Sequence, residues 1–286
     1  MSLGDLEWYS QRGLGAGKPE PTVSIVIPAK NEALNLPHVF AGLPPGLHEV
    51  ILVDGRSTDD TVNVARKLRP DVTIIGQTRK GKGNALACGL EEASGDFIVM
   101  MDADGSTDPA EIPRFVNALK GGADFATGSR FMPGGGSSDI TRLRRIGSYW
   151  LGKTVNLLYG MHYTDPNYGY NAFRRECRSV IDLQGGEADG ASSTEMLWGD
   201  GFEVETLIHV RIAKAGLLVA EVPCFERSRR FGTSNLNAFS DGIRVLRTIH
   251  VERRHGIRRA VESSANSQRD VGTSWSVLST LADKAS

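Results

Sequence analysis

This chain has little cysteine, no long hydrophobic run and no excess of charge of one sign. Its three cysteines, Cys88, Cys177 and Cys224, are far apart and not at metal-ligand spacing. The sequence therefore predicts no disulfide framework and favours the reducing cytoplasm. No apolar run reaches the roughly 18 residues that a membrane-spanning helix needs, so we expect a soluble protein. The N-terminus lacks a basic segment followed by an apolar one, so we expect no secretory signal there.

The balance of charge excludes another class of function. The 286 residues carry 33 basic and 34 acidic side chains, for a formal net charge of -1. We therefore expect no general attraction to nucleic acid or to a membrane, although local charge is uneven. The composition, 40% hydrophobic, is enough for one large domain over residues 21–237. We expect a flexible arm over 1–20, a basic amphipathic helix over 238–260 and a disordered tail over 261–286.

Hydrophobic patterning predicts strands that alternate with helices. Short links and this alternation indicate an α/β fold with a mostly parallel, doubly wound sheet and helices on both faces. A capping box at residues 57–60 and a cap at Asp108 would start two of the helices. Ligands of such sheets bind beyond the carboxyl ends of the strands. We expect strands at 23–28, 50–53, 72–75, 97–101, 125–127 and 217–222, a helix at 203–215, and loops at 134–138 and 226–235.

The most informative motif is Asp102-Ala103-Asp104, directly after the apolar run 97–101. A buried strand that ends in this way delivers two carboxylates to its tip. Their oxygens suit a hard divalent cation, Mg²⁺ or Mn²⁺, and such a cation suits a diphosphate. We therefore expect Asp104 to bind a metal, and Asp102 to contact a ribose or the metal through water. The alternative is a pair that caps the next helix.

A second candidate is Lys82, which lies between Gly81 and Gly83. The glycines would let the backbone approach a ligand closely, and the lysine would supply a mobile positive charge. Because no Ser or Thr follows Lys82, the motif is not a Walker loop. The alternative is a solvated turn.

Two further side chains follow predicted strands and would lie at the same edge of the sheet. Arg130 comes directly after a strand and a Gly-Ser turn, where it would pair with phosphate or sugar oxygens. Asp54 ends another strand and could accept hydrogen bonds from a nucleotide base, or cap the turn at Ser57. The polar clusters after these strands predict one shared site.

Together these motifs resemble family 2 glycosyltransferases of the GT-A fold. The resemblance implies that residues 21–130 form the nucleotide-sugar half of the domain and 131–237 the acceptor half. Residues 221–223 and 229–235 resemble the branch that includes dolichyl- and polyprenyl-phosphate mannose synthases. The motifs are IVIPAKNE at 25–32, VDGRSTD at 53–59, GKGNA at 81–85, MDAD at 101–104 and GSR at 128–130.

The resemblance also implies roles for single residues. Arg229 would lie, with Arg230, in a loop that closes over the diphosphate; the alternative is a solvated basic loop. The branch often has a further polar ligand at the position of Ser106, where serine is weaker than an amide. The resemblance implies catalytic roles for Asp104, Glu205 and Arg130. It implies contact with the acceptor for Asp165, Tyr168 and Asp200. The donor would contact Pro28, Asn31, Glu32, Asp54, Lys82, Asp102, Ala103, Arg229 and Ser234.

The implied activity is an inverting sugar transfer from a donor of the GDP-mannose or UDP-glucose type, assisted by Mg²⁺ or Mn²⁺. The acceptor we favour is a polyprenyl phosphate; the alternative is a hydroxyl or amine of a small metabolite or polysaccharide. In the wider family a carboxylate near Glu205 is the general base, which an anionic phosphate acceptor would not need. Two other classes are a sugar nucleotidyltransferase, which the glycine-free segment 28–32 disfavours, and a catalytically dead nucleotide-sugar binding protein.

The predicted last helix bears on partners. Phe239, Ile243, Leu246 and Ile249 recur at helical spacing, among several arginines and a single acidic residue, Glu252. A basic amphipathic helix can lie on an anionic bilayer, which would suit a lipid acceptor and a cytoplasmic protein that is peripheral at the membrane surface. The alternatives are that this helix packs on the domain, or that it packs against a second copy of the chain in a homodimer.

Overall fold

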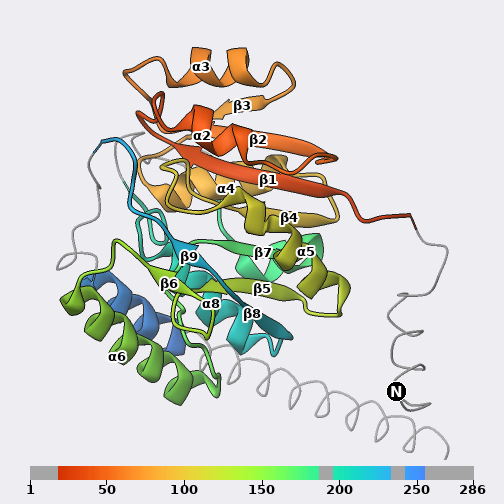
Figure 1. The fold of residues 1–286 in the computed structure, drawn as a ribbon. Helices are drawn as coiled ribbons and strands as arrows, with labels where there is room; N and C mark the ends of the chain where they lie inside the picture. The colour runs from red at the N-terminus through yellow and green to blue at the C-terminus, as the bar shows by residue number, and fades with distance from the viewer. Residues whose placement is uncertain (1–18, 187–195, 233–241, 255–286) are drawn as a thin grey trace, which may run out of the picture.

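The computed structural model describes residues 19–186, 196–232 and 242–254. Its centre is a seven-stranded sheet in the order β3-β2-β1-β4-β7-β5-β8 (Figure 1). Neighbouring strands are parallel except for β7, which runs antiparallel to β4 and β5. The predicted fold class, a mostly parallel α/β sheet, is confirmed. The strands are β1 (Val23–Ala29), β2 (Glu49–Asp54), β3 (Thr73–Gly76), β4 (Phe97–Met100), β5 (Phe125–Ser129), β7 (Asn171–Arg174) and β8 (Val219–Pro223).

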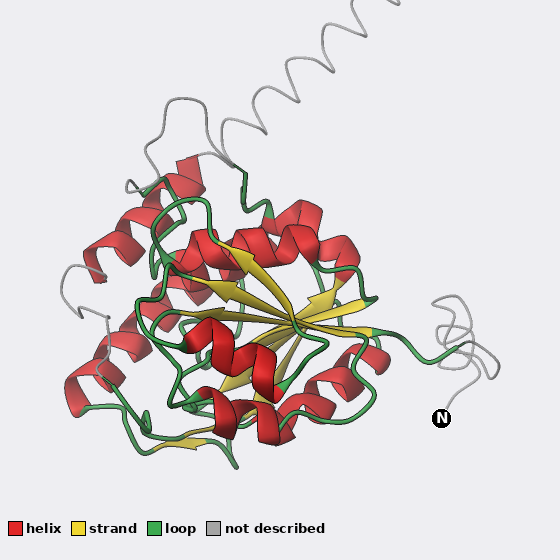
Figure 2. Ribbon diagram, turned by 90° about the horizontal axis from the view of Figure 1, so that it is seen from above, coloured by secondary structure: helices red, strands yellow, loops and turns green. Residues whose placement is uncertain are grey.

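Helices cover both faces of the sheet (Figure 2). Because side chains of a strand alternate between faces, Ile25 and Ile27 of β1 pack in one core and Val26 packs in the other. None of the helices in the described residues is long and apolar enough to span a bilayer. The helices are α2 (Leu36–Ala41), α3 (Thr61–Leu68), α4 (Lys82–Glu92), α5 (Ile112–Lys120), α6 (Arg142–Tyr159), α7 (Arg178–Ile181) and α8 (Val204–Lys214), with 3₁₀ turns η1 (Pro109–Glu111) and η2 (Arg175–Cys177).

Two local predictions differ from the structure. The loop expected at 134–138 contains the short strand β6 (Gly136–Ser137), which pairs with β9 (Phe225–Glu226). The capping box expected at 57–60 does not form, because Asp60 caps α3 without a side-chain hydrogen bond. The other predicted cap is confirmed, since the Asp108 side chain accepts a hydrogen bond from the Ala110 amide at 3.1 Å.

A third apolar cluster joins α6, α8 and the helical residues 242–254 through Val155, Val210 and Ile249. The Tyr159 hydroxyl donates a hydrogen bond to the Ile249 carbonyl at 2.8 Å. The described part of the predicted helix 238–260 is therefore helical and lies beside α6 (Figure 1). Residues 1–18 of the predicted arm and the predicted tail 261–286 lie outside the described residues.

Candidate active site

One lysine connects the two halves of the predicted site. Asp102 follows β4, Lys82 opens α4 and Glu205 lies in the first turn of α8. Lys82 Nζ is 2.6 Å from Asp102 Oδ1 and 2.8 Å from Glu205 Oε1. A single ammonium group thus holds together a carboxylate of the predicted donor side and one of the predicted acceptor side. The lysine is held in place, rather than mobile as its glycine neighbours suggest.

The charges of this cluster perturb each other. Burial raises the pKa of Asp102 to about 6; Lys82 opposes this rise, while the charges of Asp104 and Glu205 add to it. Burial disfavours the charged form of Lys82, but its two carboxylate partners outweigh burial and raise the pKa of the ammonium group. Lys82 is therefore charged at neutral pH. Because Asp102 and Asp104 repel each other, a cation that reaches both would stabilise the cluster.

The second carboxylate of the motif has its own cation. Arg229 Nη2 lies 3.4 Å from Asp104 Oδ2 and 2.9 Å from Glu32 Oε1. The Ser106 amide donates to Asp104 Oδ1 at 2.9 Å. Burial raises the pKa of Glu32, against hydrogen bonds from Asn35 and Arg229. The basic loop after β9 is thus fastened to the acidic edge of the sheet by Arg229.

The residues present fit a hard divalent cation. Asp102 and Asp104 offer carboxylate oxygens, and each carboxylate already attracts a cation of the protein. Within the described residues, no group of three or more His, Cys, Asp or Glu side chains is arranged to hold a metal. The protein would supply two carboxylates and leave the other positions to phosphate oxygens and water, as Mg²⁺ sites commonly do.

The glycines beside Lys82 serve a purpose that the sequence did not show. A Cβ on Gly81 would lie 2.0 Å from the Asp200 carbonyl oxygen, and one on Gly83 would lie 1.8 Å from that of Gly199. The Gly83 amide donates to the Asp200 carbonyl at 2.7 Å. These glycines therefore let two backbones approach each other. We expected the approach of a ligand.

A buried ion pair fixes this contact. Arg79 Nε and Nη2 donate to the Asp200 carboxylate at 2.8 and 2.9 Å, and both side chains are almost fully buried. Arg79 Nη2 also donates to the Gln184 carbonyl at 2.7 Å. Asp200, which we expected at the acceptor, is thus bound within the framework that supports Lys82. Sequence reasoning missed Arg79, whose only signal is its place three residues before Lys82.

Glu205 retains unused hydrogen-bonding capacity. Its side chain is 9% exposed, and apart from the ion pair with Lys82 neither oxygen has a hydrogen-bond partner among the described residues. A Cβ on Gly169 would lie 2.6 Å from Glu205 Oε1 and 2.9 Å from Lys82 Nζ. Only glycine fits there without moving the pair. A buried carboxylate with free acceptor positions suits a hydroxyl-bearing ligand.

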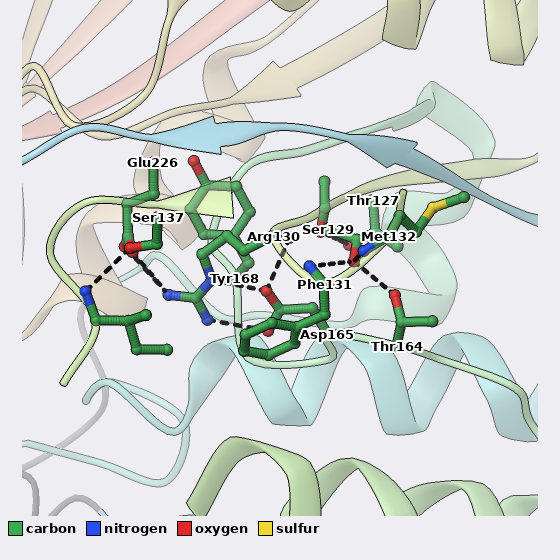
Figure 3. Close-up of polar contacts among 12 residues, drawn as sticks. Thr127, Ser129, Arg130, Phe131, Met132, Ser137, Thr164, Asp165, Tyr168 and Glu226 are labelled. Atoms are coloured by element: carbon green, nitrogen blue, oxygen red, sulfur yellow. Dashed lines mark hydrogen bonds and ion pairs between the residues drawn. The ribbon is translucent and has the colours of Figure 1, made fainter. Parts of the chain in front are cut away.

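Arg130 lies in a separate network (Figure 3). Its Nε and Nη2 donate to the two oxygens of Asp165 at 2.6 and 2.9 Å, and its Nη1 donates to Glu226 at 3.1 Å. The guanidinium stacks 4.8 Å from the centre of the Tyr168 ring. These partners bury Arg130 and join β5, the segment before β7, and β9. Its expected contact with donor phosphate stays a prediction, as do the acceptor roles of Asp165 and Tyr168.

The remaining donor candidates line the ends of β1, β2 and β4. Asp54 accepts from the Ser57 amide at 3.2 Å, as its alternative role requires. Asn31, at a φ of 58°, accepts from the Thr58 amide at 2.7 Å and so joins the loops after β1 and β2. The side chains that the structure brings together in one cluster are Glu32, Lys82, Asp102, Asp104, Glu205 and Arg229. Pro28 is the last residue but one of β1, and Ala103 lies between the two aspartates after β4. Ser234 lies outside the described residues.

Comparisons with known proteins identify the family of the chain. The model of the family "Glycosyl transferase family 2" matches residues 24–179. The "Polyprenol monophosphomannose synthase" of Mycolicibacterium smegmatis is 32% identical over 249 residues, 79% of this chain and 88% of that protein. The "Undecaprenyl-phosphate mannosyltransferase" of Micrococcus luteus is 32% identical over 225 residues, 75% of this chain and 87% of that protein.

Solved structures show the same fold. Glucosyl-3-phosphoglycerate synthase from Mycobacterium tuberculosis, in complex with Mg²⁺ and uridine diphosphate, superposes with a TM-score of 0.62 at 22% identity. The superposition covers 88% of this chain and 83% of that one. At this identity the likeness shows the fold, and the GT-A architecture expected from the sequence is thereby confirmed.

Proposed function

Because this chain belongs to glycosyltransferase family 2, we propose that it transfers a sugar from a nucleoside diphosphate sugar to a polyprenyl phosphate, with Mg²⁺ or Mn²⁺ bound. The observation that carries the proposal is the cluster of Asp102, Asp104 and Lys82 at the carboxyl ends of the strands. Two relatives carry names of polyprenyl-phosphate mannose transfer. An acceptor of this kind is a membrane lipid, so the proposal includes peripheral contact with a membrane.

The donor would bind over β1 and β4. Asp102 and Asp104 would hold the metal, which supplies Lewis-acid stabilisation of the diphosphate leaving group. Arg229 now pairs with Glu32 and Asp104, and it would exchange these carboxylates for diphosphate oxygens. Closure of its loop would exclude water and so limit hydrolysis of the donor.

The transfer itself would be a direct displacement with inversion. A phosphate oxygen of the acceptor forms the new bond to the anomeric carbon while the bond to the diphosphate breaks. The attacking phosphate is anionic at neutral pH and needs no general base. Glu205, fixed by Lys82, would then orient the sugar by accepting hydrogen bonds from its hydroxyl groups.

A second candidate is transfer to a hydroxyl of a soluble metabolite. The free acceptor capacity of the buried Glu205 carboxylate favours it, because a hydroxyl nucleophile must lose its proton as it attacks. The two candidates assign different tasks to this residue. Replacement by glutamine would slow transfer to a hydroxyl far more than transfer to a phosphate.

Extraction of product into organic solvent tests the proposal. The full chain is incubated with Mn²⁺, detergent-dispersed undecaprenyl phosphate and labelled GDP-mannose or UDP-glucose. We expect label in the organic phase with one donor, and its loss in Asp104→Asn but not in Asp71→Asn, which changes an exposed surface carboxylate. Label that stays in the aqueous phase with both donors would contradict a lipid phosphate acceptor.

A further inference from the structure

The two outermost helices of the acceptor half expose apolar side chains to solvent. On α6 the exposed ones are Ile146, Tyr149, Trp150 and Leu157. Residues 242–254 expose Ile243 and Leu246, whereas Ile249 is buried against α6 and α8. The apolar stripe expected on the last helix is therefore divided, and Phe239 lies outside the described residues. Of the exposed apolar side chains of these two helices, more lie on α6, where the sequence had not suggested them.

These side chains form one face of α6. Arg142, Ile146, Tyr149, Trp150, Lys153 and Leu157 recur at intervals of three and four residues, so they share one side of the helix. Trp150 is 65% exposed and Leu157 is 85% exposed. The opposite side packs on α8 through Val155. We call these six residues the outer face of α6. An exposed aromatic and aliphatic stripe on an otherwise packed helix indicates an interaction surface.

The exposed charged side chains of α6 and of residues 242–254 are all basic. The polar members of the outer face, Arg142 and Lys153, are both basic, and α6 contains no acidic residue. Residues 242–254 expose Arg247 and Arg253, and their one acidic residue, Glu252, is buried and bound by Arg211 and Lys214. Basic side chains therefore surround the exposed apolar groups of both helices.

We propose that the outer face of α6, with the neighbouring helix 242–254, docks on an anionic phospholipid bilayer. Trp and Tyr are the side chains that favour the boundary between lipid and water, and Arg and Lys beside them are attracted to anionic headgroups. A second copy of the chain fits this face poorly, because two-fold pairing would bring basic groups against basic groups. The proposal deepens the proposed function, on which it rests for the need to reach a membrane lipid. Since α6 packs on α8, docking would place the helix that carries Glu205 close to the membrane.

Sedimentation with vesicles measures this docking apart from catalysis. The vesicles contain equal parts of phosphatidylcholine and phosphatidylglycerol, with no polyprenyl phosphate and no sugar nucleotide. We expect the full chain to sediment with them, and to bind pure phosphatidylcholine much more weakly. Raising the salt from about 0.1 M to about 1 M should release the protein, since the Debye length falls from about 10 Å to about 3 Å. Equal binding to both vesicles would overturn the proposal.

Matched variants locate the surface. Arg142→Gln with Lys153→Gln should weaken binding about twenty-five-fold, because each basic residue near an anionic surface contributes about a fivefold gain. Arg66→Gln with Lys67→Gln removes the same charge from the exposed side of α3, at the other end of the sheet (Figure 1), and should bind as the unchanged protein does. Equal losses in the two double variants would contradict a specific face.

Trp150→Ser tests the apolar part without disturbing the core, since Trp150 is exposed. We expect about tenfold weaker vesicle binding and an unchanged melting temperature. Light scattering in the absence of lipid checks the alternative occupant: a dimer that Trp150→Ser dissociates would show that this face pairs two copies, and would overturn the proposal. Transfer to a short-chain, water-soluble prenyl phosphate should be unaffected by all of these variants. If the unchanged protein did not carry out this transfer, the proposed function would be refuted, while vesicle binding would still test the outer face of α6.

Discussion

Replacement of Lys82 by methionine removes the charge at the centre of the site and keeps most of its length. Lys82 Nζ is within 2.8 Å of a carboxylate oxygen of both Asp102 and Glu205. The variant leaves these two carboxylates, and Asp104 nearby, with no ammonium group between them. Because like charges then repel each other in a partly dry site, we expect the ligand-free protein to be destabilised.

The expected size follows from burial. Removing one partner of a buried ion pair costs about 3–5 kcal/mol, and an exposed pair is worth less than about 1 kcal/mol. The side chains of Lys82 and Glu205 are 15% and 9% exposed, but that of Asp102 is 32% exposed and reaches water. We therefore expect Lys82→Met to lower the free energy of unfolding by about 2–3 kcal/mol at neutral pH.

Urea unfolding at several pH values measures this loss. As the pH falls towards about 6, the pKa of Asp102 beside Lys82, this carboxyl takes up a proton in the variant, so the difference from the unchanged protein should shrink. Lys67→Met, at an exposed position of α3, should change stability by less than about 0.5 kcal/mol. Adding Asp102→Asn to Lys82→Met should restore part of the stability. The reasoning would be refuted if Lys82→Met were as stable as the control, or if the second substitution destabilised it further.

Three further predictions concern the framework. Gly83→Ala, whose Cβ would lie 1.8 Å from the Gly199 carbonyl oxygen, should destabilise the protein by about 2 kcal/mol or more. Gly147→Ala, with open space around it on α6, should stabilise the protein by about 0.8 kcal/mol. Thermal unfolding of both variants tests whether Gly83 is needed for the close backbone contact, and equal effects would contradict that role. Arg130→Lys should destabilise the ligand-free protein by about 2 kcal/mol through loss of its bidentate pairing with Asp165; an unchanged melting temperature would favour a role in donor binding alone. Burial opposes ionisation of Glu252, but Lys214 and Arg211 outweigh it and lower its pKa. The difference in free energy of unfolding between the unchanged protein and Glu252→Gln should therefore be largest above about pH 4.5 and vanish as the pH falls further. A difference that is constant with pH would contradict this pairing.

The elements that sequence patterns predict well are those with strong local signals. The strands β1, β2 and β4 follow from apolar runs, and the Asp108 cap follows from its proline neighbour. The strand β7 was not predicted, because Asn171 and Arg174 bound only two apolar residues. Its place between β4 and β5 depends on pairing with distant strands, which no local pattern specifies.

The site divides in the same way. Residues that end strands, such as Asp102 and Asp104, could be assigned to one edge of the sheet because parallel strands share that edge. Contacts across the chain could not be assigned in advance. Lys82 meets Glu205, and Arg79 meets Asp200, only because the tertiary fold brings α4 against the start of α8. Gly81 and Gly83 were recognised as necessary, but the close neighbour was protein backbone, which the sequence alone could not identify.

Metal-dependent binding of a nucleoside diphosphate tests the central claim most directly. The melting temperature of the full chain is measured with GDP, UDP and dTDP, each with and without Mn²⁺, and again in Asp104→Asn. A ligand at about 100 times its Kd stabilises the native state by about 2.7 kcal/mol, which corresponds to a rise of about 5–10 °C for a domain of this size. We predict such a rise with one nucleotide, only with Mn²⁺ and only in the unchanged protein. The same rise without Mn²⁺, or in Asp104→Asn, would contradict the assignment of the diphosphate to this acidic edge.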